Sequence, residues 1–419
     1  MSEYNIFKLD SAAIAYPYFA SRKAAYSFTL EATLDEDINY QALYSAVQKL
    51  YDRFPSMFVR LKKCRRGYEL EHSSDVSSYL KKISFKSLKP FEIKDENNLI
   101  YISYNRNVIY AEFFHAVTDG NGGLVFFKSL LAEYLRNLGI DIPCANGVLS
   151  PNDLPKECEL EDSYKANYDK KLGTVNRMEN FAFQPKTYNS NNQWHRSNLY
   201  INLSDLKSLS KKHNATITQL IVSVYIYAFY LLRTTQKSKK NIAVAVPINL
   251  RSTFNSDSLR NFSLYFLAKL PAGKINLETI LEQVKKDFAS GCDKTLLQKM
   301  INTNVSQQEM LFFRLLPRFM KKIVLKTGFQ LFGERLYTST LSNIGVINLP
   351  QEMKKHIISF RGMLGPVLIN RIHCMAYCYN DVFSVTFTSR LNNSVIEDAM
   401  VQILSQHGIE AKLEFDKYD

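Results

Sequence analysis

The sequence contains few of the residues that mark fibrous, disulfide-bonded or metal-binding proteins. Only 15 Gly and 12 Pro occur among 419 residues, too few for a fibrous or low-complexity chain. The six cysteines form no CxxC pair and no spacing typical of zinc ligands, so we expect reduced thiols and no metal site. Cys374 and Cys378, four residues apart on a predicted strand, are expected to face the same core.

Long hydrophobic runs are absent as well. The longest apolar stretch, residues 217–232, is interrupted by Thr218, Gln219 and Ser223. It falls short of the roughly 20 residues that span a bilayer, so it predicts a buried helix. The opening residues, MSEYNIFKLD, have neither the basic nor the apolar region of a signal peptide. These features together predict a cytoplasmic protein.

Nucleotide-binding motifs are also lacking, because neither a GxxxxGK[ST] loop nor a GxGxxG motif occurs. The charge, in contrast, is one-sided: 53 Lys and Arg against 40 Asp and Glu give a formal net charge of +13. Such a charge fits a nucleic acid, a membrane surface, or an acidic ligand or partner protein. Since the basic residues are scattered and no known reading module is present, we do not expect nucleic-acid binding.

Hydrophobic residues make up 46% of the chain, enough for a large core, and their spacing alternates between strand and helix periods. Strands are expected near residues 24–34, 99–104, 108–114, 199–203, 242–248 and 337–341, and helices near 40–51, 122–139, 216–232, 277–290 and 395–404. Between 144 and 193 the periodicity fades and polar residues accumulate. We therefore predict an α/β protein with a first half at 1–143, a crossover linker at 144–193 and a second half at 194–419.

The segment FFHAVTDG, residues 113–120, is the most informative for chemistry. A rigid sheet would hold His115 at the end of a strand, and a neutral imidazole, with a usual pKa of about 6.5, can take a proton from a hydroxyl or an amine. Asp119 is placed to fix the loop or to pair with an arginine, and Gly120 permits a tight turn into the next helix. The same spacing also fits a plain strand-end histidine followed by an aspartate that caps the helix.

The order of these elements resembles the CoA-dependent acyltransferase superfamily, which includes chloramphenicol acetyltransferase, plant BAHD acyltransferases, peptide-synthetase condensation domains and bacterial alcohol acetyltransferase-like proteins. His115, Asp119 and Gly120 match its HxxxDG signature. Four further segments are similar to the alcohol acetyltransferase-like branch: RFP at 53–55, VPINLR at 246–251, LRNF at 259–262 and LSNIG at 341–345. The sequence departs from the plant enzymes in lacking DFGWG, and from condensation domains in having Phe114 in place of the first histidine of HHxxxDG.

The resemblance implies two similar mixed-sheet α/β halves of the chloramphenicol acetyltransferase type, with a tunnel at their interface. It implies transfer of an acyl group, expected to be acetyl, from a CoA thioester to a hydroxyl or amine. His115 would act as general base, and no cofactor would be bound permanently. Asp119 is expected to pair with Arg251, although Arg251 could instead touch the ligand or be solvated.

Further site residues follow from the same resemblance. Ser342 and Asn343, at a predicted strand end, are candidates to hold the oxyanion, or else they form a turn that satisfies its own backbone. Phe114, Asn249 and Arg251 are assigned to substrate binding.

The expected partners are an acyl-CoA or a phosphopantetheine-bearing carrier protein, together with a small alcohol or amine acceptor. The alternatives are a condensation-type enzyme that uses carrier-bound thioesters and a non-catalytic relative that acts as a binding protein. On this interpretation, the charge of +13 attracts a phosphate-bearing thioester or an acidic carrier. Residues 307–326 are basic and amphipathic; we interpret them as a core-facing helix with a solvated basic face rather than a membrane-binding segment.

Overall fold

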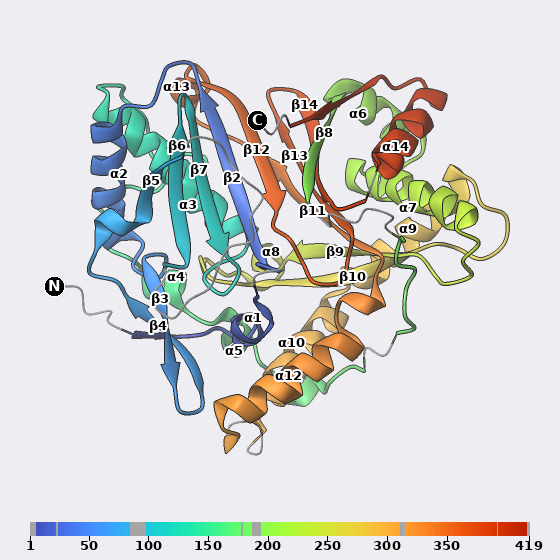
Figure 1. Ribbon diagram of the computed structural model, residues 1–419, viewed down its shortest axis with the longest axis horizontal. Helices are drawn as coiled ribbons and strands as arrows, with labels where there is room; N and C mark the ends of the chain where they lie inside the picture. The colour runs from blue at the N-terminus through green and yellow to red at the C-terminus, as the bar shows by residue number, and fades with distance from the viewer. Residues whose placement is uncertain are drawn as a thin grey trace.

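The fold consists of two large β-sheets, each covered by helices, as the computed structural model shows (Figure 1). The structure describes residues 6–21, 24–83, 98–176, 179–186, 194–310, 313, 315–391 and 393–416. The first sheet has the strand order β12-β2-β7-β6-β5 and the second the order β10-β9-β11-β13-β14-β8-β15. A small sheet, β1-β4-β3, lies beside the first.

The helices and strands alternate along the chain as the sequence predicts. The strands are β1 (Ile6–Lys8), β2 (Ser27–Leu34), β3 (Val59–Cys64), β4 (Gly67–His72), β5 (Leu80–Lys82), β6 (Ile100–Asn105), β7 (Val108–Phe114), β8 (His195–Asn202), β9 (Ala243–Asn249), β10 (Ser263–Lys269), β11 (Ser339–Val346), β12 (Ile357–Leu364), β13 (Ile372–Tyr379), β14 (Val382–Ser389) and β15 (Ala411–Phe415). The α-helices are α1 (Tyr16–Phe19), α2 (Tyr40–Arg53), α3 (Gly120–Asn137), α4 (Glu157–Leu160), α5 (Ser163–Ala166), α6 (Leu203–Lys212), α7 (Ile217–Thr235), α8 (Arg251–Phe254), α9 (Leu277–Gly291), α10 (Lys294–Glu309), α12 (Arg318–Phe332), α13 (Gln351–Lys354) and α14 (Val395–Gln406). Short 3₁₀ turns lie at η1 (Ala13–Ala15), η2 (Val76–Tyr79), η3 (Lys170–Leu172) and η4 (Glu334–Leu336).

The first sheet is built around the predicted hairpin of β6 and β7. The hairpin turns at Arg106 and Asn107, between paired Asn105 and Val108, and Arg106 has a φ of 48°. Alternate residues of β6 are buried, as expected for a strand with one face on the core. Helices α2 and α3 pack against each other beside this sheet (Figure 1).

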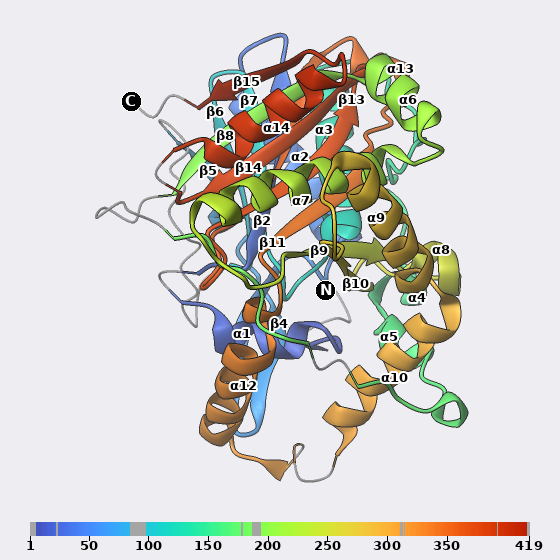
Figure 2. The ribbon, with the colours of Figure 1, turned by 90° about the vertical axis from the view of Figure 1, so that its right-hand side faces the viewer.

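The second sheet carries α7, α9 and α14 on one face (Figure 2). Helix α7 begins at a capping box in which Thr216 and Gln219 bond each other's backbone N–H groups. It is long and apolar enough to cross a bilayer, yet more than half of its apolar window is buried inside the protein, as predicted for a core helix. Cys374 and Cys378 are buried in the same core, which confirms that prediction.

Strand β12 joins the two halves of the chain. It belongs to residues 194–419 but pairs antiparallel with β2 at the edge of the first sheet, and Figure 1 shows the two strands side by side. The first sheet is therefore completed by a strand from the second half. The residue boundaries of the halves stay a prediction.

Two segments differ from the sequence-based expectation. Strand β11 does not end at Leu341 but continues to Val346, because Ser342 and Asn343 pair with Met375 and Ala376 of β13. The basic stretch 307–326 is not one helix: α10 ends at Glu309 and α12 begins at Arg318. Residues 311, 312 and 314 of that stretch lie outside the described residues.

Candidate active site

His115 lies where β7 ends, at the junction between the two halves of the chain. Its backbone N–H donates to the carbonyl of Tyr26 at 3.1 Å, next to the pairing of β7 with β2. The strand therefore fixes the residue before the loop begins, and the side chain keeps part of its surface accessible. The predicted place of His115 after a strand is confirmed.

The side-chain amide of Asn261 holds the imidazole from the second half. Its Nδ2 donates to the His115 carbonyl at 2.9 Å and to Oδ2 of Asp10 at 3.0 Å, so Oδ1 is left as the acceptor. That oxygen lies 3.2 Å from Nδ1 of His115, which makes Nδ1 the N–H donor and leaves the lone pair on Nε2. Among the described residues no hydrogen bond is made to Nε2. The tautomer is the one that a general base acting through Nε2 requires.

Two aromatic rings enclose the imidazole. The ring of Tyr16 stacks on it at a centroid distance of 5.1 Å and an angle of 14°, and the ring of Phe28 meets it edge-on at 5.3 Å. Burial lowers the pKa of His115 below its usual value, while Asn261 and the nearby charge of Asp119 oppose the shift. The imidazole is therefore predominantly neutral near pH 7, which is the state a base needs.

Two further tyrosines, Tyr265 and Tyr337, lie near Tyr16. Tyr265 and Tyr337 meet edge to face at 5.9 Å, and both interact electrostatically with Tyr16. Burial raises the pKa of Tyr16 and of Tyr337, so both hydroxyls stay protonated. All three side chains keep some accessible surface. The predicted tunnel itself stays a prediction.

Asp119 and Arg251 form the predicted pair. The guanidinium donates to the carboxylate through two bonds, Nη1 to Oδ2 at 2.9 Å and Nη2 to Oδ1 at 3.0 Å. Oδ1 also accepts from the backbone N–H groups of Asn121 and Gly122, and Oδ2 from that of Phe262. Asp119 thus caps α3 and pairs with the arginine at once, so both of its sequence-based interpretations are correct. Both oxygens of the carboxylate are taken up by these contacts, which fix the loop.

The assignment of Arg251 to substrate binding is corrected by these contacts. Its remaining donors bond the carbonyls of Ser258 and Arg260 and the Oδ1 of Asn249, and its side chain is buried. No donor of the guanidinium remains for a ligand. Asn249 is exposed at the end of β9, and its role in substrate binding stays a prediction.

Phe114 is also misassigned as a substrate contact. Its side chain is fully buried in the core of the first half, where β7 is covered on both faces, since the neighbouring Phe113 is fully buried as well. A side chain with no accessible surface cannot line a binding site. Phe114 instead packs beside Tyr16, with their ring centroids 6.3 Å apart.

The glycines after Asp119 serve close packing rather than a strained turn. Gly120 is the first residue of α3 and has no positive φ, so the predicted turn function is wrong for it. At Gly122, a Cβ atom would lie 2.0 Å from the carbonyl oxygen of Leu259. Helix α3 can therefore approach the second half only with glycine at 122.

Ser342 and Asn343 point to opposite faces of β11. The amide of Asn343 donates to Oγ1 of Thr218 at 2.8 Å and accepts from the N–H of Gly345 at 2.9 Å. Asn343 thus satisfies local groups, as the alternative interpretation holds, and its role as an oxyanion donor stays a prediction. Ser342 lies on the other face of the strand. Ile344 is on the same face as Ser342 and lies next to Gly120. The role of Ser342 as a donor stays a prediction.

Asn261, Asp10 and Tyr16 are site residues that the sequence did not indicate. Asn261 belongs to the LRNF segment, one of the segments on which the resemblance rests. The sequence therefore drew attention to this segment, but it did not show that Asn261 contacts His115. Asp10 and Tyr16 come from the start of the chain, more than 90 residues before His115, and no spacing rule links them to it. Burial raises the pKa of Asp10 to about 6, although Arg260 opposes the shift.

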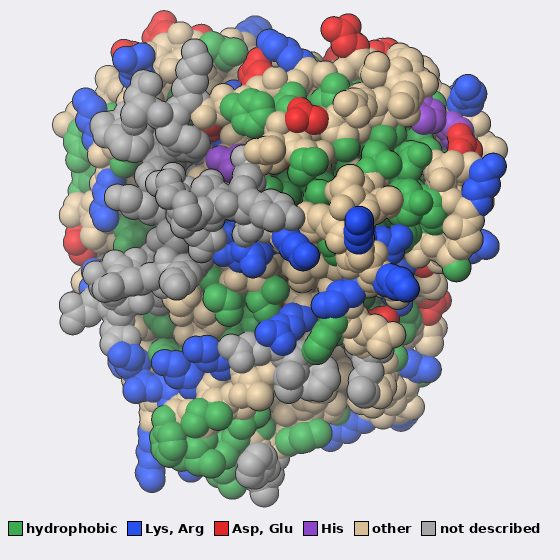
Figure 3. Space-filling view, turned by 45° about the vertical axis from the view of Figure 1, so that its right-hand side comes forward, with side chains coloured by type: hydrophobic (Ala, Val, Ile, Leu, Met, Phe, Trp, Pro, Cys, Tyr) green, Lys and Arg blue, Asp and Glu red, His purple; other side chains and the backbone are tan. Residues whose placement is uncertain are grey.

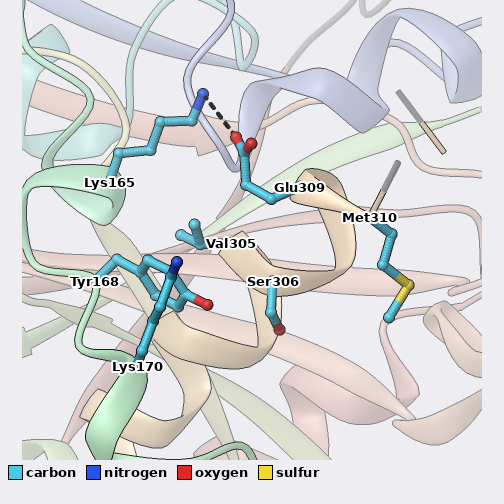
Figure 4. A pocket seen from close by; sticks show the side chains of 7 residues that line it. All are labelled: Lys165, Tyr168, Lys170, Val305, Ser306, Glu309 and Met310. Atoms are coloured by element: carbon cyan, nitrogen blue, oxygen red, sulfur yellow. Dashed lines mark ion pairs between the residues drawn. The ribbon is translucent and has the colours of Figure 1, made fainter. Parts of the chain in front are cut away.

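No group of three or more His, Cys, Asp or Glu arranged to hold a metal ion occurs in the part of the chain that the structure describes. A surface hollow of about 570 Å³ lies apart from His115, between the segment around α5 and α10 (Figure 4). Its lining comprises Lys165, Tyr168, Lys170, Val305, Ser306, Glu309 and Met310. Lys165 and Glu309 form an ion pair of 3.6 Å across it.

No family model and no curated protein sequence matches this chain. Solved structures match it over nearly its whole length. The first condensation domain of the CDA synthetase aligns at 13% identity, with 96% of each chain covered and a TM-score of 0.62. A mutant starter condensation domain of rhizomide synthetase, in complex with C8-CoA, aligns at 13% identity, with 96% of this chain and 94% of that chain covered and a TM-score of 0.62.

This chain has the condensation-domain fold. Polyketide synthase associated protein 5 from Mycobacterium tuberculosis shares that fold, at 14% identity and a TM-score of 0.61, with 96% of this chain and 97% of that chain covered. The α/β architecture predicted from the resemblance is thereby confirmed. In the condensation-domain fold described here, His115 and Asp119 lie in the first half and Asn261 and Arg251 in the second, so the site is assembled from both.

Proposed function

We propose that this protein is an acyltransferase of the CoA-dependent acyltransferase superfamily and moves an acyl group from a thioester to a hydroxyl or amine. The observation that carries the proposal is the state of His115. Its Nδ1 is bound by Asn261, burial favours the neutral ring by lowering the pKa, and Nε2 has no hydrogen-bond partner among the residues that the structure describes. The C8-CoA bound by the rhizomide synthetase domain supports an acyl-CoA donor. We propose a cytoplasmic location, an acetyl or other short acyl group and a likeness to alcohol acetyltransferases in particular.

The reaction needs one proton carrier and no covalent enzyme intermediate. The acceptor's oxygen or nitrogen attacks the thioester carbonyl carbon, and Nε2 of His115 takes its proton as the new bond forms. The tetrahedral intermediate then collapses, the carbon–sulfur bond breaks, and the imidazolium returns the proton to the thiolate. The products are an ester or amide and a free thiol. Positioning both substrates next to His115 makes the attack effectively unimolecular.

Other residues act through geometry and charge. The Asn261 oxygen supports the imidazolium that forms in the transition state, because a hydrogen bond to a charged group is stronger than one to a neutral group. The ion pair of Asp119 and Arg251 fixes the position of the HxxxDG loop relative to the second half of the chain. Ser342 is the proposed donor to the oxyanion, with its hydroxyl on the face of β11 turned toward the first half.

The test is an acceptor-dependent release of thiol from acetyl-CoA and from C8-CoA, with alcohols and amines as acceptors. We expect release with free acyl-CoA, and a loss of about 10²–10⁴-fold in the His115→Ala variant. His356→Ala is the matched control, since His356 pairs with Asp35 near the surface and should keep full activity. Unchanged release in His115→Ala would overturn the proposed role of the base. Release only from carrier-bound thioesters would favour the condensation-type alternative.

A further inference from the structure

Helix α12 is packed against the protein through only part of its surface. Lys321 turns inward, and its Nζ donates to the carbonyl of Arg66 at 2.7 Å. The guanidinium of Arg318 lies over the ring of Tyr68 at 5.6 Å. Near the other end of the helix, Phe329 stacks on Phe19 of α1 at 4.0 Å. These contacts define the inner face of α12.

The outer face of α12 is apolar. Phe319 is 67% exposed and Ile323 is 63% exposed, and Met320 and Val324 are exposed beside them. At about 100° per residue these four positions fall on one continuous arc of the helix. The interpretation of this segment as a core-facing helix with a solvated basic face therefore holds only in part. Leu316 is buried and Lys322 and Lys326 are exposed, as expected. Lys321, in contrast, lies inside, and Phe319 and Ile323 lie outside.

The apolar face extends toward the preceding loop and gathers at one end of the molecule. Met310 and Leu315, which precede α12, are more than half exposed. Figure 3 shows hydrophobic side chains clustered at the lower end of the protein, the end where Figure 1 places α12, with Lys and Arg side chains next to them. Such a contiguous apolar patch marks an interaction surface.

The surroundings of the patch are basic. Lys322 and Lys326 are exposed on α12 along the edge of the apolar arc, and residues 310–332 contain no Asp or Glu. Arg65 and Arg66 are exposed at the tip of the β3–β4 hairpin. This tip is fixed to α12, because the N–H of Arg318 donates to the Arg65 carbonyl at 3.3 Å. An apolar arc with cations at its edge is complementary to an anionic, amphiphilic surface.

We propose that the outer face of α12 docks this protein on an anionic lipid membrane. The helix would lie in the plane of the interface, with Phe319 and Ile323 between the headgroups, while the lysine and arginine side chains reach the lipid phosphates. Each basic residue near such a surface strengthens binding by about fivefold. A second copy of the chain fits less well, because a symmetric contact would bring the cations of the two copies together.

The position of the patch relates it to the active site. Phe329 on α12 also meets Tyr26 edge-on at 5.8 Å, and the neighbouring α1 carries both Phe19 and Tyr16. Tyr16 in turn stacks on His115. Helix α12 would therefore lie between a bound membrane and the short helix that covers the imidazole. The docking proposal stands on the patch and its charges and does not depend on the reaction.

The test is co-sedimentation of the full chain with vesicles of phosphatidylcholine alone and with about 30 mol % phosphatidylglycerol. We expect binding to the anionic vesicles that weakens with added salt, and little binding to the neutral ones. The variant Phe319→Asp with Ile323→Asp should bind at least about tenfold more weakly. Lys322→Ala with Lys326→Ala should weaken binding to anionic vesicles by about 25-fold.

The matched control is Ile358→Asp, an apolar residue that is 60% exposed on β12 and should not change binding. Thermal unfolding of each variant verifies that it is folded. The proposal is overturned if the wild-type protein stays in the supernatant with both kinds of vesicle, or if the double aspartate variant binds like the wild type. It is also overturned if size-exclusion chromatography with light scattering shows a dimer that the same variant dissociates, since the patch would then join two copies.

Discussion

Asn261 and His115 are joined by two hydrogen bonds across the two halves of the chain: Nδ2 of Asn261 donates to the His115 carbonyl at 2.9 Å, and Oδ1 lies 3.2 Å from the imidazole Nδ1. The amide thus fixes both the backbone and the ring. Asp10 accepts from the same amide at 3.0 Å and is itself held by the backbone N–H groups of Ala12 and Ala13. The base is therefore oriented by a chain of buried contacts behind it.

Replacing Asn261 by Ala should lower kcat without unfolding the protein. A hydrogen bond to a charged group contributes about 1.5–3 kcal/mol, so losing the support of the imidazolium should cost roughly 10–150-fold in kcat. The Asn261 contact also raises the pKa of His115. The acid limb of the pH profile should therefore move to lower pH in the variant. Steady-state kinetics between about pH 5 and pH 8 measure both effects; an unchanged acid limb would contradict them.

Removing the charge of Asp119 should destabilise the protein strongly. The Asp119→Asn variant leaves the guanidinium of Arg251 buried and uncompensated, which costs about 3–5 kcal/mol of unfolding free energy. The matched control is Glu179→Gln, because Glu179 pairs with Lys269 at 2.7 Å on the surface and such pairs contribute less than about 1 kcal/mol. Urea unfolding compares the two variants. Equal losses would show that burial does not determine the strength of the Asp119 pair.

Gly122 and Gly120 should respond differently to the same substitution. In Gly122→Ala the new Cβ would lie 2.0 Å from the Leu259 carbonyl oxygen, whereas in Gly120→Ala it would lie 3.4 Å from Cγ2 of Ile344. The first change forces α3 away from the second half, at a cost of about 1–3 kcal/mol or more. The second should change the melting temperature little, because the added methyl group makes an ordinary contact. Thermal melts of both variants test the difference, and a more damaging Gly120→Ala would refute it.

Glu397 should make the protein less stable at alkaline than at acid pH. Its side chain is fully buried, with Oε1 bonded to Ser197 at 2.9 Å and Oε2 without a partner. Burial raises the pKa of Glu397 from 4.5 to about 7. The folded state thus binds the proton more tightly than the unfolded state, and its stability falls as the pH rises from the unfolded pKa through the folded one.

The Glu397→Gln variant removes this ionisation. Above the folded pKa it should be more stable than the wild type by roughly 3–4 kcal/mol, since the shift from 4.5 to about 7 corresponds to about 1.4 kcal/mol per pKa unit. Below the unfolded pKa the difference should vanish. Urea unfolding on either side of that interval measures the change, with Glu410→Gln as the control because Glu410 is exposed. A constant difference between the variants at all pH values would rule out the explanation.

The sequence predicted the fold well where signals are local. The period of apolar residues located β2, α2, the β6–β7 hairpin and α7, since each buries one face or both against a sheet. The HxxxDG segment located His115 at a strand end, and the strand before Arg251 placed that residue near Asp119. The positions of His115 and Arg251 could be predicted because each follows the end of a strand, and the spacing of apolar residues shows where a strand ends.

The sequence could not predict contacts between distant segments. Asn343 was expected at a strand end, but pairing with β13 extends β11 through it, and that pairing is set by residues about 30 positions away. Phe114 and Arg251 were predicted to bind the substrate. The sequence shows neither that Phe114 is buried nor that protein groups accept all the N–H donors of Arg251, because both depend on how the chain packs. The exposed face of α12 was misjudged for the same reason, since periodicity shows that a helix has two faces but not which one is covered.

The place of β12 at the edge of the first sheet has a consequence for how the protein is made. Residues 27–34 leave the ribosome long before their neighbour at 357–364, which is translated more than 300 residues later. Until then, one edge of β2 is open to pairing with other chains. We therefore expect that a fragment ending before Ile357 aggregates, and that the nascent first half depends on protection until residues 357–364 have been made.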